Sequence, residues 1–109
     1  MTLQNRLKAV GTALTQIPQA KVYHYTKPAN VKAPYIVWME EGGDTFRADN
    51  RNGEVSATGT IDIYSKNEFD ALFDAPPSAL NGVATCELNS VQYEDETKLI
   101  HYAWRWGDS

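Results

Sequence analysis

The chain of 109 residues has little of what several classes of protein require. Its single cysteine, Cys86, excludes an internal disulfide framework and suits a reducing compartment. No apolar run approaches the roughly 18 residues of a membrane span, and polar residues stand where a signal peptide has its apolar core. The formal charge of −4 lacks the basic excess of proteins that bind nucleic acid directly. We therefore expect a soluble, cytoplasmic protein without a membrane partner.

Motifs that carry chemistry are also missing. His24 and His101 have no metal-ligand partner at suitable spacing in the sequence, so we expect each ring to face solvent or a satisfied neighbour. Cys86 has no surrounding motif and is expected to act as a small buried hydrophobic residue. Residues 49–54 resemble a calcium loop only in part, because Arg51 stands where that pattern needs an oxygen ligand. The sequence offers no catalytic, cofactor-binding or metal-binding residue, and we expect a protein that is not an enzyme.

The composition that is present predicts one globular domain over residues 1–109. Hydrophobic residues make up 42% of the chain and charged residues 22%, which is an ordinary globular balance. Apolar residues recur at three- and four-residue steps over residues 3–17, which predicts a helix that Thr2 caps and Pro18 ends. The pattern also predicts a second helix and five strands, at residues 68–75 and at residues 21–25, 35–41, 55–66, 83–93 and 98–106.

The order of these elements predicts an α+β fold, an antiparallel-rich sheet of about five strands with two helices packed on one face. In the third strand, Ile61 belongs to the set expected to face the helices, while Asp62 points the other way. For the strand at residues 35–41 both alternating sets are large, so its buried face stays open. We expect Asn67 to cap the second helix and the prolines at residues 76–77 to interrupt it. The buried stripe expected on that helix consists of Phe69, Leu72 and Phe73.

Aromatic side chains are abundant, with three tryptophans and six tyrosines. Trp and Tyr are enriched at interfaces because they are large, rigid and half polar, although filling the core of the sheet stays open as their role. Phe46 lies at the middle of a polar loop between two strands, where an apolar ring gains little unless a partner covers it. We therefore expect contacts rather than chemistry, with interface residues in this loop and at the end of the last strand: Phe46, Arg47, Asp49, Asn50, Trp104 and Trp106.

Several segments together resemble a known family. They are a short N-terminal helix, an aromatic strand at residues 22–25, the segment at residues 33–37, the polar loop at residues 46–50, the strand at residues 61–66, and a final hairpin whose turn lies between residues 93–97 and 101–102. Across nearly the whole chain, this arrangement resembles the small tail-terminator (tail-completion) proteins of long-tailed bacteriophages and prophages. The chain is shorter than many members, so appended docking loops are expected to be missing.

The resemblance implies a structural virion protein that forms a ring, typically of six subunits. Such a ring caps the head-proximal end of the tail tube, ends its polymerisation and joins the tail to the head. The implied partners are other copies of the chain, the major tail tube protein and the head-closure complex, with DNA only as passing cargo. Assembly would take place in the host cytoplasm, and the product would lie in the tail or neck of the virion. A neck or head-closure connector component is the alternative, and an uncharacterised enzyme is a further one that no residue recommends.

The ring also suggests roles for two acidic residues. Each subunit would turn one sheet face toward the channel, and acidic walls would avoid trapping the phosphates of passing DNA. Glu40 and Asp62 are the residues that we expect to face this channel. A ring further needs two non-identical surfaces that match, for which the Phe46 loop and the aromatic end of the last strand are the expected pair.

Overall fold

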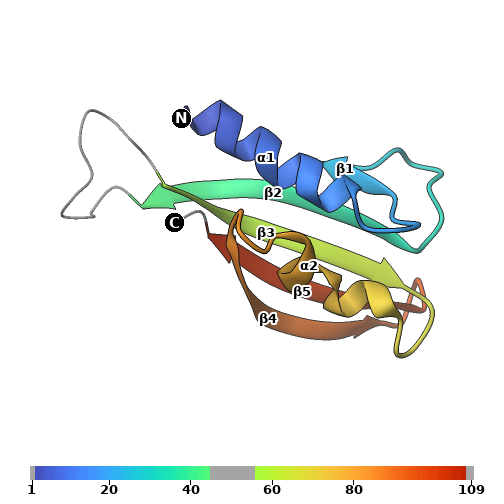
Figure 1. The fold of residues 1–109 in the computed structure, drawn as a ribbon. Helices are drawn as coiled ribbons and strands as arrows, with labels where there is room; N and C mark the ends of the chain where they lie inside the picture. Colours follow the sequence, from blue (N-terminus) through green and yellow to red (C-terminus); the bar gives the residue numbers. More distant parts are fainter. Residues whose placement is uncertain (1, 45–55, 108–109) are drawn as a thin grey trace.

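The computed structural model describes residues 2–44 and 56–107. The predicted α+β class and the predicted order of helices and strands are both confirmed (Figure 1). One short 3₁₀ helix, η1, precedes the second α-helix. The elements are α1 (Leu3–Thr15), β1 (Val22–His24), β2 (Tyr35–Asp44), β3 (Ser56–Ser65), η1 (Ala71–Asp74), α2 (Ala75–Ala79), β4 (Thr85–Glu94) and β5 (Leu99–Gly107).

Helix α1 begins where the sequence predicts. The hydroxyl oxygen of Thr2 accepts the N–H of Asn5 at 3.1 Å, which satisfies a backbone donor that the first turn leaves without a partner. Gly11 allows the helix to approach the sheet closely, because a Cβ there would lie 2.9 Å from Cζ2 of Trp38. The apolar stripe of the helix is buried, through Leu7, Val10 and Leu14.

The five strands form one mixed sheet in the order β1-β2-β3-β5-β4. Only β1 and β2 run parallel, and the other three pairs are antiparallel. The helices lie on one face of this sheet (Figure 1). On that face Ile36 is the cross-strand partner of Ile63, and Trp38 is the partner of Ile61. All four are buried, so Ile36 and Trp38 decide the buried face of β2 that the sequence left open.

The second helical region differs from the prediction. The helix does not begin at Asn67, because Asp70 is the cap: its Oδ1 accepts the N–H of Leu72 at 3.0 Å and starts η1. The prolines at residues 76–77 lie in the first turn of α2 rather than interrupting a helix, since a first-turn residue needs no N–H donor. Leu72 and Phe73 are buried as expected, but Phe69 lies before the cap and is 97% exposed, so its place in the buried stripe was wrong.

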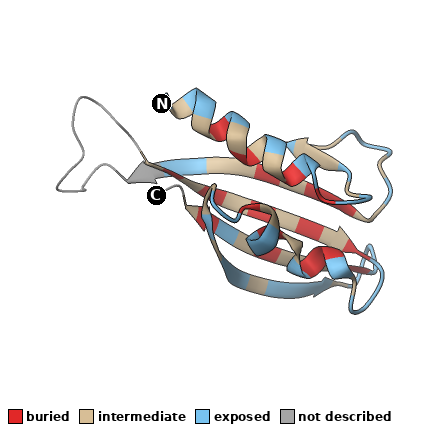
Figure 2. Ribbon diagram, in the orientation of Figure 1, coloured by how far each residue is buried: buried red, intermediate tan, exposed pale blue. Residues whose placement is uncertain are grey.

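Among residues 2–44 and 56–107, no helix is long and apolar enough to cross a membrane. The molecule is elongated, with principal extents of 46 × 25 × 22 Å. Exposed residues concentrate on β4, at one border of the sheet, while β3 in the middle is alternately buried and half-buried (Figure 2). The geometry therefore leaves three surfaces for contact: the face without helices and the two borders of the sheet.

Candidate interface surfaces

Four of the predicted interface residues, Phe46, Arg47, Asp49 and Asn50, lie outside the described residues. The other two lie on β5. Trp106 is 2% exposed and belongs to the core, so it is not available as a surface anchor. Its prediction as an interface residue was wrong, because alternation along β5 turns it toward the helices and its ring packs edge-on against Trp38.

Trp104 lies on the same face of β5 as Trp106 and is half-buried. Its indole N–H donates a hydrogen bond to the backbone carbonyl of Phe73 at 2.8 Å. This bond ties η1 to the sheet, and the stacked rings of Phe73 and Tyr102, with centroids 4.0 Å apart, reinforce it. Trp104 therefore has a role within the fold of the chain, and only the remaining exposed part of its ring is open to a partner.

Glu40 and Asp62, both expected to face a channel, lie on opposite faces of the sheet. Glu40 follows Trp38 by two residues and so shares the helix-covered face. Asp62 pairs in register with Val37 and Ala103 on the face without helices. A single sheet face therefore cannot turn both carboxylates toward one channel.

Glu40 takes part in a small polar and aromatic cluster at the β1 border. Its Oε1 lies 2.8 Å from Nε2 of His24, and its Oε2 accepts the hydroxyl of Tyr25. The imidazole of His24 is stacked between the rings of Tyr25 and Trp38, with centroids 3.8 and 3.9 Å away. Burial raises the pKa of Glu40, but the hydrogen bonds from Tyr25 and His24 outweigh it, and the net pKa is lowered. The cluster thus holds an ionised carboxylate close to the edge of the sheet.

The face without helices carries a row of stacked rings. Tyr35, Tyr64 and His101 are cross-strand neighbours on β2, β3 and β5, with ring centroids 5.0 and 4.3 Å apart. Nε2 of His101 lies 2.8 Å from Oδ1 of Asp62. Burial, followed by the negative charges of Asp62 and Glu94, raises the pKa of Tyr64 to about 12. This face is therefore apolar and aromatic at one end, with one half-buried carboxylate at its middle.

Both histidines thus have a carboxylate neighbour. This agrees with one of the two environments expected from the sequence, a neighbouring group that satisfies the ring nitrogen. The partners are 16 and 39 residues away in the sequence, so no local spacing announced them. Within the described residues, no group of three or more His, Cys, Asp and Glu side chains is placed to hold a metal ion. Cys86 is half-buried, and burial raises the pKa of its thiol to about 11, which suits the packing role expected of it.

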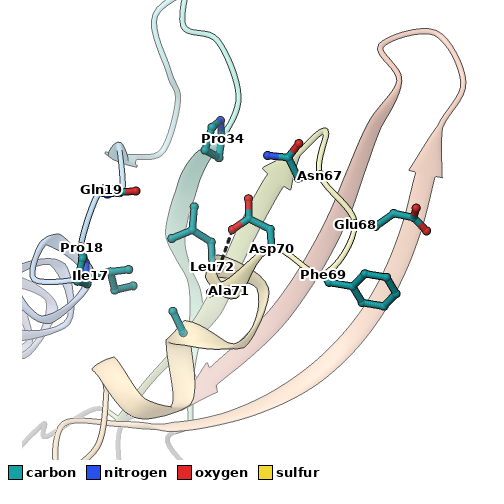
Figure 3. Close-up of a pocket in the computed structure, with 11 residues that line it drawn as sticks. Ile17, Pro18, Gln19, Pro34, Asn67, Glu68, Phe69, Asp70, Ala71 and Leu72 are labelled. Atoms are coloured by element: carbon teal, nitrogen blue, oxygen red, sulfur yellow. Dashed lines mark hydrogen bonds between the residues drawn. The ribbon is translucent and has the colours of Figure 1, made fainter.

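Phe69, which the sequence placed in a buried stripe, is an exposed aromatic residue in the structure. Its backbone φ of 60° lies in the left-handed region, and the loop around it is firmly bonded. The buried hydroxyl of Ser65 donates to Oδ2 of Asp70 at 2.7 Å and accepts the N–H of Asn67 at 3.1 Å. Figure 3 shows the ring of Phe69 pointing away from Leu72, beside a hollow of about 820 Å³. Asp70 as the helix cap was the sequence signal that could have predicted the exposure of Phe69, because the residue before a cap lies outside the helix.

Strand β4 forms a long border of the sheet. Within the described residues no strand pairs with its outer side, and it is ten residues long. Its helix-side face carries Leu88, Val91 and Tyr93, which are 48%, 49% and 58% exposed. These three residues, called the β4 strip below, stay exposed although α2 contacts β4 on the same face. Exposed apolar residues along the outer edge of a sheet mark a surface that favours a partner.

Comparison with known proteins gives little beyond this geometry. No family model and no curated protein matches the sequence. Among solved structures, the chain is similar to one in a structure described as "Virion of native gene transfer agent (GTA) particle". The similarity covers 98% of this chain and 90% of that chain, with 10% sequence identity and a TM-score of 0.48. At this identity and TM-score the likeness carries no argument about function.

Proposed function

We propose that the chain is a structural virion protein that forms a ring at the head-proximal end of a phage tail tube. The ring ends polymerisation of the tube and joins the tail to the head. The proposal begins from the resemblance of the sequence to tail-terminator proteins. The observation that carries it is the one-sided sheet, whose helices cover one face and leave the other face and both borders open to partners (Figures 1 and 2).

A ring subunit needs surfaces of this kind. It contacts its two neighbours through two different patches. The two borders of this sheet differ, because β1 forms one and β4 forms the other. It also turns one face to the channel, and the face without helices is available for that role. On this face Asp62 is the acidic residue of the expected pair, whereas Glu40 stands on the other face. The proposal therefore keeps Asp62 as the channel-facing carboxylate and places Glu40 at the border between neighbours.

The partners that follow are further copies of the chain, six in a closed ring, together with the tail tube protein and the head-closure complex. DNA passes through the ring without being bound in place. This role is structural, and no chemical step is assigned to any residue. A connector component of the neck would use the same kind of surfaces but would bind the head-closure complex and not the tube.

The test is tube capping. The purified protein is mixed with tubes assembled from the tail tube protein of the same genome, and fresh tube protein is then added. We expect a closed ring at one end of each tube in electron micrographs and no further growth from that end. Tubes that elongate at both ends as they do without the protein would overturn the proposal. A ring that binds the head-closure complex alone would select the connector function instead.

A further inference from the structure

The two borders of the sheet carry opposite charge. Residues 21–39, which contain β1, its connection to β2 and the first half of β2, hold three lysines and no acidic residue. The carboxylate of Glu40 lies against His24 and Tyr25 at this border, and the three lysines still leave the border with a net positive charge. Residues 85–98, which contain β4 and its turn, hold four acidic residues and one lysine. We call the first segment the basic border and the second the acidic border. The sheet order places them at opposite sides of the subunit, with β2, β3 and β5 between.

The lysines of the basic border are held near one end of the strands. Nζ of Lys21 donates to the carbonyl of Lys32, and Nζ of Lys27 lies 5.2 Å from the centre of the Tyr35 ring, at the start of β2. The turn of the acidic border lies at the same end of the sheet (Figure 1). Two subunits side by side, in the same orientation, therefore bring the basic connection of one to the level of the acidic turn of the next.

We infer that the acidic border and the β4 strip bind the basic border of a second copy of this chain. The inference rests on the proposed ring and names the two surfaces that build it. Opposite charges that lie at the same level on two neighbouring copies fix their relative orientation and register. The β4 strip adds apolar surface to this contact. Because the two surfaces differ, the contact runs head to tail, as a closed ring requires.

The length of β4 suits a continuous contact. Ten residues at ~3.3 Å each make β4 about 33 Å long. Three exposed apolar side chains lie along this length, so a neighbour can contact the border over most of the strand.

Two charge-reversed variants test the inference. The acidic-border variant is Asp95→Lys/Glu96→Lys, and the basic-border variant is Lys27→Glu/Lys32→Glu. In the first variant both borders are basic, and in the second both are acidic, so neither should associate with itself. We expect each variant to remain monomeric by light scattering at concentrations where the unmodified chain assembles, with association at least about ten-fold weaker. Glu68→Lys/Asp74→Lys is the control for the acidic-border variant, since it reverses two charges of the same sign at exposed residues outside both border segments and should assemble normally.

Mixing the two variants gives the decisive result. Each border of one variant then meets a border of opposite charge on the other, so an equimolar mixture should assemble to the size of the unmodified protein. This recovery also shows that both variants are folded. Variants that each assemble like the unmodified chain, or a mixture that stays monomeric, would overturn the inference.

The outcome separates this inference from the proposed function. Rings that cap tubes, but form equally well from either variant alone, would leave the function standing and remove the border contact. Rings whose assembly depends on the border charges, but which fail to cap tubes, would support the border contact and remove the proposed function. Added salt provides a further measurement: because the border charges are exposed, raising the ionic strength should weaken association of the unmodified chain.

Discussion

Among the glycines that the structure describes, Gly59 is the one whose surroundings are least able to accept an added methyl group. It lies in β3, paired with Glu40 of β2 and with Trp106 of β5. A Cβ at this position would lie 2.0 Å from the backbone oxygen of Met39 and 2.7 Å from Nε1 of Trp106. The oxygen belongs to a paired strand and the indole is in the core, so neither group yields easily. Gly59→Ala should therefore separate β2 from β3 or displace Trp106.

The size of the effect follows from these contacts. Overpacking a well-filled core usually destabilises by about 1–3 kcal/mol, and a clash with a strand backbone places Gly59→Ala at or above about 3 kcal/mol. Because 1 kcal/mol shifts the melting temperature of a 60–100-residue domain by about 4–8 °C, we expect a fall of at least about 12 °C. Gly42→Ala is the control, since a Cβ at Gly42 meets no atom within 4 Å.

Thermal unfolding followed by circular dichroism measures both variants. The protein is kept dilute enough to be monomeric, because assembly would raise the melting temperature by mass action. Gly42→Ala should melt within a few degrees of the unmodified chain. Trp106→Phe added to Gly59→Ala should recover little, since the contact with Met39 persists. A Gly59→Ala variant that melts together with Gly42→Ala would refute this account of the packing.

Two further predictions concern the exposed loop and the border cluster. Phe69→Gly removes a side chain that is 97% exposed from a residue with a φ of 60°, so unfolding in urea should show a free energy unchanged or higher by up to about 1 kcal/mol. Phe73→Ala, which removes a buried ring from the same region, should instead lower the free energy of unfolding by about 3–5 kcal/mol. Equal losses in the two variants would contradict the assignment of Phe69 to the surface and Phe73 to the core. The lowered pKa of Glu40 means that its ionised form stabilises the folded state above the ordinary value of 4.5, and that this contribution is lost as the pH falls below it. The melting temperature of Glu40→Gln should therefore lie below that of the unmodified chain at neutral pH and approach it in acid, whereas a constant difference would show that charge plays no part.

Sequence patterns predicted a helix or strand well where its apolar residues follow a single repeat, either helical or alternating. Helix α1 has a clear cap at Thr2 and a stripe at helical spacing, and β3 alternates without interruption, so both follow from the sequence. The second helical region was placed less well, because Asn67 and Asp70 are both good caps and only packing selects between them. Choosing Asp70 left Phe69 outside the helix and in solvent.

The sequence by itself determined the α+β class, the order of the elements and the abundance of aromatic side chains, because these depend on periodicity and composition. The tertiary structure decided which aromatic rings are surface and which are core. Trp106 turned inward because the register of β5 faces it toward the helices. Strand pairing also set Glu40 and Asp62 on opposite faces, and brought each histidine to a carboxylate far away in the chain. The basic and acidic segments can be read from the sequence, but only the sheet order places them at the two opposite borders of the sheet.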